Sequence, residues 1–311
     1  MRVWKLRIGS IILGLSTVLL SATAAANIAA QPDPEEITVI GKRLTPAQAR
    51  ERAIAFVQHT GITYGRESVA RWIDPVCVRA IGLEPANLQR VEKTVRAIAE
   101  SAGVPVGKPG CTPNATINFV GDGAAFTKSV AARDQRRLAE VPKHLKLALL
   151  NGPAPIRWWY RTELRGSDGM KLVGMMPPSL FGDRGDPAPP GLPGNSNEAS
   201  TRLGSNTSNV STQVARRLIS ATVVVDAVKA EGVPLESVAA YAAMVTFAEL
   251  LPRDTSFDGS ILGLFGNQPS RTITPLDQAF LKELYSLKMD RKARQQRARL
   301  VNRLQSVQTS F

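Results

Sequence analysis

The chain contains few of the residues from which metal centres and nucleophilic active sites are built. Its 311 residues include two histidines and two cysteines. The histidines, His59 and His144, stand far apart, and neither belongs to a cluster of His, Cys, Asp and Glu with the spacing of metal ligands. The Gly-x-Ser-x-Gly turn of serine hydrolases is missing as well. The sequence therefore predicts no metal site and no cofactor.

Long apolar runs are equally scarce. One such run, residues 11–20, follows Arg2, Lys5 and Arg7 and precedes small residues that offer several cleavage sites. This three-part pattern predicts a signal peptide over residues 1–30, because the run is too short to span a membrane as a helix. An uncleaved membrane anchor is the alternative. No second run of 18 apolar residues follows, so we expect a periplasmic or secreted protein without a transmembrane helix.

Both cysteines, Cys77 and Cys111, lie in the part of the chain that would be exported. Export favours disulfide formation, and a bridge between them would close a loop of about 35 residues. The alternative is a thiol pair that binds metal or acts in catalysis, for which a Cys-x-x-Cys spacing is missing. The sequence predicts a Cys77–Cys111 disulfide.

Positive charge is abundant. The formal net charge is +13, and without the three basic residues of the predicted signal peptide it is about +10. A balance of this kind favours anionic partners such as lipid headgroups, acidic polymers or nucleic acid.

The spacing of apolar residues predicts helices that alternate with strands. Thr-Pro pairs at Thr45 and Thr274 are typical of helix starts, with the threonine as cap and the proline as the first helical residue. Further helices are predicted over residues 85–102, 124–133, 234–250 and 260–265, and strands over residues 69–73, 115–120, 156–164 and 213–226, with Trp72 inward. The fold class predicted is α/β (α+β), with helices layered on small mixed sheets.

Composition divides the chain into segments. Residues 177–209 are rich in Pro, Gly, Ser and Asn, and a loop of that length is functional, disordered or a separator of two lobes. The segments expected are a signal peptide (1–30), a flexible leader (31–44), an N-terminal α/β part (45–176), this loop (177–209), a C-terminal part (210–287) and a basic C-terminal helix (288–311).

The order of elements in the C-terminal part resembles that in a group of uncharacterised secreted bacterial proteins and in a broader family with a zincin-like metallopeptidase half. The likeness lies in a strand, a helix, a Ser-Ile segment and a closing helix, at residues 218–226, 237–244, 258–262 and 273–285. Within the closing helix the matching positions are Thr274, Asp277, Leu281, Leu284 and Tyr285. This resemblance implies a zincin-like fold for residues 210–287.

The chemistry of that family requires two histidines one helical turn apart and a glutamate beside the first. The matching positions here hold Ala240 and Met244, with Tyr241 in place of the glutamate. None of the three can act as an imidazole or carboxylate ligand, so they are predicted to be core residues. We expect a non-catalytic exported protein that binds an unknown partner on a degenerate metallopeptidase-like scaffold. A hydrolase with an unrecognised site that uses His59 or His144 is the alternative.

Gly121-Asp122-Gly123 stands between a predicted strand and a predicted helix, where dinucleotide-binding proteins carry a glycine-rich turn. The third glycine of that pattern is replaced by Phe126. A tight strand-to-helix turn explains both glycines, and no nucleotide cofactor is expected.

The last predicted helix continues past Leu287 and becomes strongly basic. Its positive residues are spread around the helix, with Asp290 as the one acid up to residue 303. The segment is predicted either to be a solvated terminal helix or to bind an anionic component of the cell envelope, such as lipid or another polyanion. The residues that would bind are Lys288, Arg291, Lys292, Arg294, Arg297, Arg299 and Arg303.

Overall fold

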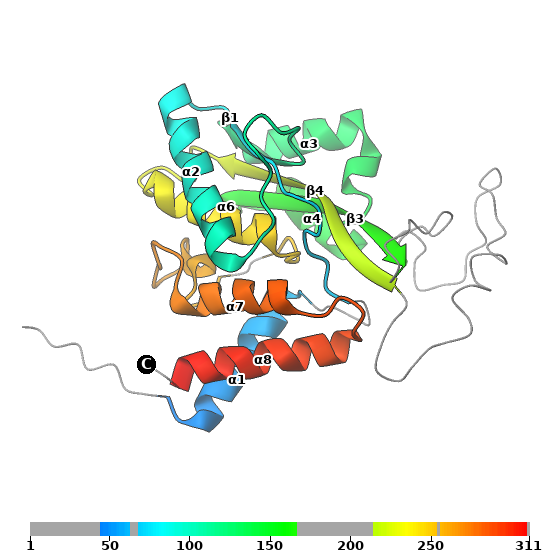
Figure 1. Cartoon of the computed structure of the whole chain (residues 1–311). Helices are drawn as coiled ribbons and strands as arrows, with labels where there is room; N and C mark the ends of the chain where they lie inside the picture. Colours follow the sequence, from blue (N-terminus) through cyan, green and yellow to red (C-terminus); the bar gives the residue numbers. More distant parts are fainter. Residues whose placement is uncertain (1–43, 63–67, 167–213, 254–255, 310–311) are drawn as a thin grey trace, which may run out of the picture. The chain divides into compact units, whose positions relative to one another are not determined.

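The computed structural model describes residues 44–62, 68–166, 214–253 and 256–309 (Figure 1). The predicted signal peptide, nearly all of the leader and the Pro/Gly-rich loop lie outside these residues. In the described part the chain forms seven α-helices and one mixed sheet of four strands, so the prediction of a mixed α/β fold is confirmed at this level.

The sheet joins strands from both sides of the Pro/Gly-rich loop. Its order is β1-β2-β4-β3, where β1 (Val78–Ile81), β2 (Ala115–Val120) and β4 (Val214–Asp226) are parallel and β3 (Ile156–Gly166) is antiparallel to β4. Because β4 lies between β2 and β3, the parts predicted as 45–176 and 210–287 share one sheet.

Helices cover both faces of this sheet. Val223 and Val225 of β4 face the main core, and Val224 between them faces a smaller one, as expected from the alternation of side chains along a strand. The main core lies on the side of α2 (Pro85–Ala102) and α6 (Leu235–Phe247). The smaller core lies on the side of α3 (Gly123–Arg133) and α4 (Lys143–Asn151) (Figure 1).

Both predicted Thr-Pro starts are confirmed, and the predicted disulfide between Cys77 and Cys111 is present. Thr45 begins α1 (Pro46–Thr60) and Thr274 begins α7 (Pro275–Ser286). At each, the threonine side chain accepts the backbone N–H three residues on, and the side chain there accepts the threonine N–H in return. These capping boxes satisfy donors that the first turn leaves free.

One predicted strand is wrong, and one observed strand was missed. Residues 69–73 form no strand; Arg71 makes a single bridge to Arg217, and Pro75 shortly afterwards supplies no N–H for further pairing. Trp72 does point inward, with 1% of its surface exposed. Strand β1 was not predicted, because four residues of which one is fully buried give too short an apolar pattern.

The prediction of one continuous basic helix is also wrong. Helix α7 ends at Ser286, and a new helix, α8, spans Ala293–Thr309. The chain reverses between them so that α8 packs against α1 and α7 (Figure 1). Leu300, Val301 and Leu304 of α8 are buried in the main core. The C-terminal helix is therefore an integral part of the fold rather than a tail.

Helix α6 is buried along nearly its whole length, since every residue from Ser237 to Phe247 is buried. It has no polar face, so its terminal carbonyls cannot reach water. Aromatic side chains from three other segments supply the missing donors. Trp72 Nε1 donates to Thr246 O over 2.8 Å, and Tyr285 Oη donates to Phe247 O over 2.9 Å.

Strand β3 supplies further hydrogen bonds to the end of α6 and to the segment after it. The Tyr160 hydroxyl lies within hydrogen-bond distance of Val245 O and Ala248 O and accepts the N–H of Leu250. Trp158 Nε1 donates to Leu250 O over 2.9 Å. Three aromatic residues, Trp72, Tyr160 and Tyr285, thus satisfy carbonyls at the end of α6, and Trp158 holds the segment that follows it.

We predict that Tyr160→Phe lowers the free energy of unfolding by about 2 kcal/mol, because it leaves several buried backbone groups without a partner. Tyr285→Phe is the matched control, since it removes one bond of the same kind and should cost about 1 kcal/mol. Urea denaturation of both variants measures the difference. Equal stability of Tyr160→Phe and the parent protein would contradict the role of this hydroxyl.

Burial also raises the pKa of Tyr160 and of Tyr285 above the usual value for a tyrosine. Because the unfolded chain loses these protons near pH 10 and the folded chain holds them, we expect the stability to be fully present below about pH 10 and to decline above it. Absorbance titration should show two of the four tyrosines ionising only as the protein unfolds, and their ionisation in the folded state would refute this expectation.

Candidate functional site

The positions matched to zincin ligands lie in the interior of α6. Ala240, Tyr241 and Met244 are 4%, 6% and 0% exposed. The Tyr241 ring makes edge contacts with Trp158 and Phe265. Within the described residues no group of three or more His, Cys, Asp or Glu side chains could hold a metal ion. These three residues pack the core, as their apolar spacing indicates.

The Ser-Ile segment and the closing helix of the resemblance meet at one buried carboxylate. Asp277 of α7 is fully buried and accepts hydrogen bonds from Ser260 Oγ, from Ile261 N over 2.8 Å, and from the N–H and hydroxyl of Thr274. Burial raises the pKa of Asp277, and these donors oppose that rise. The carboxylate ties the start of α7 to the turn at η3 (Ile261–Gly263), which is a structural role.

We predict that Asp277→Ala destabilises the protein by about 3 kcal/mol, because it leaves two buried donors, Ser260 Oγ and Ile261 N, and two partly buried donors of Thr274 without their acceptor. Asp258→Ala, at an exposed carboxylate on the same turn, should change stability by less than about 0.5 kcal/mol. Thermal unfolding followed by circular dichroism compares the two. Similar melting temperatures for both variants would show that Asp277 does not stabilise the fold.

At the glycine turn before α3, a buried aspartate and a buried arginine of the protein itself occupy the space beside the backbone. Asp226 at the end of β4 accepts the N–H of Gly123 over 3.1 Å and lies 4.0 Å from the guanidinium of Arg157, which is 1% exposed. Burial lowers the pKa of Arg157, and Asp226 counteracts this. Since Asp226 occupies the place at the helix start where a phosphate would accept hydrogen bonds, the turn serves as a buried ion-pair junction.

His59 has no catalytic triad among the described residues. His59 in α1 lies against Phe257, with ring centroids 6.1 Å apart, and its Nε2 has no hydrogen-bond partner among the described residues. His144 is exposed at the start of α4. No described serine or carboxylate side chain is hydrogen-bonded to His59, so the structure gives no support to the hydrolase alternative at this residue.

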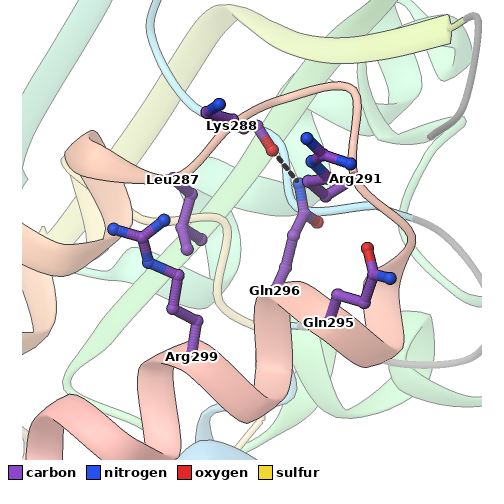
Figure 2. A pocket seen from close by; sticks show the side chains of 6 residues that line it. All are labelled: Leu287, Lys288, Arg291, Gln295, Gln296 and Arg299. Atoms are coloured by element: carbon purple, nitrogen blue, oxygen red, sulfur yellow. Dashed lines mark hydrogen bonds between the residues drawn. The ribbon is translucent and has the colours of Figure 1, made fainter. Parts of the chain in front are cut away.

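Cationic side chains gather at a pocket between α7 and α8 (Figure 2). The pocket has a volume of about 400 Å³. Lys288 and Arg291 come from the segment that links the helices, and Arg299 comes from the second turn of α8. The remaining lining residues are Leu287, Gln295 and Gln296. Three positive charges and two amides around one cavity form a surface suited to anions.

A buried glutamine shapes this pocket. Gln296 is 1% exposed, and its Nε2 donates to the carbonyl of Lys288 over 3.1 Å (Figure 2). Its Oε1 accepts the N–H of Val69 over 2.9 Å. The side chain thereby holds the linking segment on α8, and fixes the backbone from which Lys288 projects.

The pocket divides the residues predicted to bind anions into two groups. Lys288, Arg291 and Arg299 line it. Lys292, Arg294, Arg297 and Arg303 do not. The sequence could not separate them, because the break between α7 and α8 changes the direction in which each side chain points.

The comparisons with known proteins add no family. No family model, no curated protein and no solved structure matches this chain. The likeness of residues 210–287 to zincin-like proteins therefore stays a prediction. None of the helices in the described part of the chain is both long and apolar enough to cross a membrane.

Proposed function

We propose that this protein is an exported, non-catalytic binding protein that holds phosphate groups of the cell envelope in the pocket between α7 and α8. The observation that carries the proposal is the convergence of Lys288, Arg291 and Arg299 on one cavity of about 400 Å³ (Figure 2). Phosphate oxygens accept hydrogen bonds from both amine and guanidinium groups, and arginine offers them in a planar fork.

The three cations differ in how they are held. Arg299 Nε donates to Glu283 over 2.8 Å, and Glu283 is 12% exposed, so the arginine is positioned from below by a largely buried carboxylate. Arg291 lies 3.8 Å from Asp290. Lys288 forms no ion pair with a described residue and is exposed. An anion entering the pocket would find one oriented guanidinium and one available amine.

The start of α8 supports the same ligand. A helix carries partial positive charge at its N-terminus, where acidic residues are favourable. The first turn of α8 contains no acid, and Gln295 and Gln296 of this turn line the pocket. The positive end of the helix dipole therefore adds to the attraction of an anion in the pocket.

The non-catalytic part of the proposal rests on α6. A zincin-like ancestry would place the metal at Ala240 and Met244, which are core residues here. The Ser260–Asp277–Thr274 network joins the two segments on which the resemblance depends. We infer that a scaffold of this ancestry has kept its structural network while its metal-binding helix has become part of the core.

Vesicle sedimentation tests the proposal. The mature protein should bind phosphatidylcholine vesicles that contain about a third phosphatidylglycerol at low salt, and release them as salt screens the interaction. Lys288→Ala/Arg291→Ala should weaken binding about tenfold or more, because each substitution removes a charge-assisted hydrogen bond to phosphate, worth roughly 1.5 kcal/mol or more. Competition by inorganic phosphate would show that the phosphate group itself is recognised.

The control is Lys292→Ala/Arg294→Ala, which removes the same charge at neighbouring positions outside the pocket. It should weaken binding by no more than about threefold. Equal losses in the two double variants would show diffuse attraction to the basic helix and refute recognition in the pocket. Deletion of residues 288–311 is unsuitable as a test, because α8 contributes Leu300 and Leu304 to the core.

A further inference from the structure

The pocket between α7 and α8 carries less charge than its three cations alone would give it, because two of them are paired with carboxylates. Arg299 Nε donates to Glu283 over 2.8 Å, and Arg291 Nε lies 3.8 Å from Asp290. Lys288 has no such partner among the described residues. Three positive and two negative charges therefore leave the pocket cations and their partners with a net charge of +1.

The carboxylate on α7 has the stronger influence on a ligand. The Glu283 side chain is 12% exposed, whereas that of Asp290 is 43% exposed. Water and salt screen a charge less when it is largely buried. A second negative charge on a phosphate bound at Arg299 would therefore be repelled by Glu283, and the pocket has no further cation to offset that repulsion. Like charges brought together in this way select against a partner.

The pocket has room for more than a phosphate ion. Its volume of about 400 Å³ lies within the range of small-molecule sites, roughly 300–1,000 Å³. Gln295 lines it beside the cations, and Figure 2 shows its side chain on the same side of Gln296 as Arg291. Gln295 is exposed, and its amide forms no hydrogen bond with a described residue. Because an amide both donates and accepts, it suits the hydroxyl groups of a substituent on the phosphate.

We propose that this pocket selects phosphodiesters, as found in the headgroup of phosphatidylglycerol, over phosphomonoesters and inorganic phosphate. The inference rests on the proposed function, since it specifies which phosphate that site holds. A phosphodiester carries one negative charge, which matches the net charge of +1. A phosphomonoester has a second pKa of about 6 and carries close to two negative charges at pH 8. The glycerol of the headgroup supplies hydroxyls for Gln295.

The expected preference is opposite to the one that overall charge would produce. The whole chain has a net charge of +13, and the field of a basic protein attracts a dianion more strongly than a monoanion. Diffuse attraction to the basic surface would therefore favour the monoester. A preference for the diester requires the local arrangement of Glu283, Arg299 and Lys288.

Isothermal titration at pH 8 tests the inference with two soluble ligands, glycerophosphoglycerol as the diester and glycerol 3-phosphate as the monoester. The diester should bind about threefold or more tightly, because the second charge of the monoester is repelled by Glu283. At pH 5 most of the monoester carries one charge, so the preference should fall below about twofold. The diester keeps its charge at both pH values and controls for titration of the protein itself. Amide chemical shifts of residues 288–299 locate the binding.

A variant of the paired carboxylate tests its role directly. Glu283→Gln removes the negative charge, and its amide oxygen can still accept from Arg299 Nε. It should reduce the preference for the diester at pH 8 to less than about twofold, mainly by strengthening monoester binding. Glu231→Gln is the matched control, because it changes the net charge equally at an exposed position outside the pocket and should keep the preference of the parent. Full preference in Glu283→Gln would refute selection by this carboxylate.

Failure of this inference and failure of the proposed function give different results. If neither ligand shifts residues 288–299, the pocket holds no phosphate and both are wrong. If both bind there and the monoester binds as tightly as the diester at pH 8, the pocket holds phosphate without selecting the diester, and this inference alone is wrong.

Competition identifies the source of the diester. Glycerophosphoglycerol should displace the protein from vesicles that contain phosphatidylglycerol, because the fragment and the lipid headgroup would occupy the same pocket. If the fragment occupies the pocket and the protein stays on the vesicles, the lipid headgroup is not the occupant.

Discussion

The rest of the structure depends on how the end of α6 satisfies its backbone. A helix without a polar face can be buried only if its last carbonyls find donors, because an unpaired buried carbonyl is costly. Here Trp72, Tyr160 and Tyr285 supply those donors, and Trp158 donates to Leu250 O just beyond the helix. Each of these residues belongs to a different segment. The need of α6 for hydrogen-bond donors therefore fixes the positions of the Trp72 segment, β3 and α7.

This arrangement also decides where function can reside. The centre of the fold is apolar or is occupied by closed networks, such as Asp277 with its four donors and Arg157 with Asp226. Buried charges that are fully partnered stabilise a structure and offer nothing to a ligand. Groups with unused capacity lie at the periphery, as Lys288 does beside the pocket between α7 and α8, and the proposed function follows from that contrast.

The fold decides which of the many positive side chains are available to an anionic ligand. A net charge of +13 favours anionic partners in general, but it does not select residues. The fold separates cations that stabilise from cations that are available: Arg157 and Arg217 are almost completely buried, while Lys288 is exposed beside a cavity. The proposed site requires geometry as well as charge, and the hydrogen bonds of Gln296 supply it.

The sequence by itself determined the helix starts at Thr45 and Thr274, the helix from Pro85, the strands of residues 115–120 and 156–164, and the disulfide, because capping, periodicity and cysteine count act locally. It did not determine the break after Ser286 or the missing strand at residues 69–73. Only the tertiary structure decided those, since α8 had to reverse to bury Leu300 and Leu304, and Trp72 had to reach a carbonyl of α6. The pocket between α7 and α8 was likewise invisible in the sequence, because its lining residues converge only where the chain reverses between the two helices.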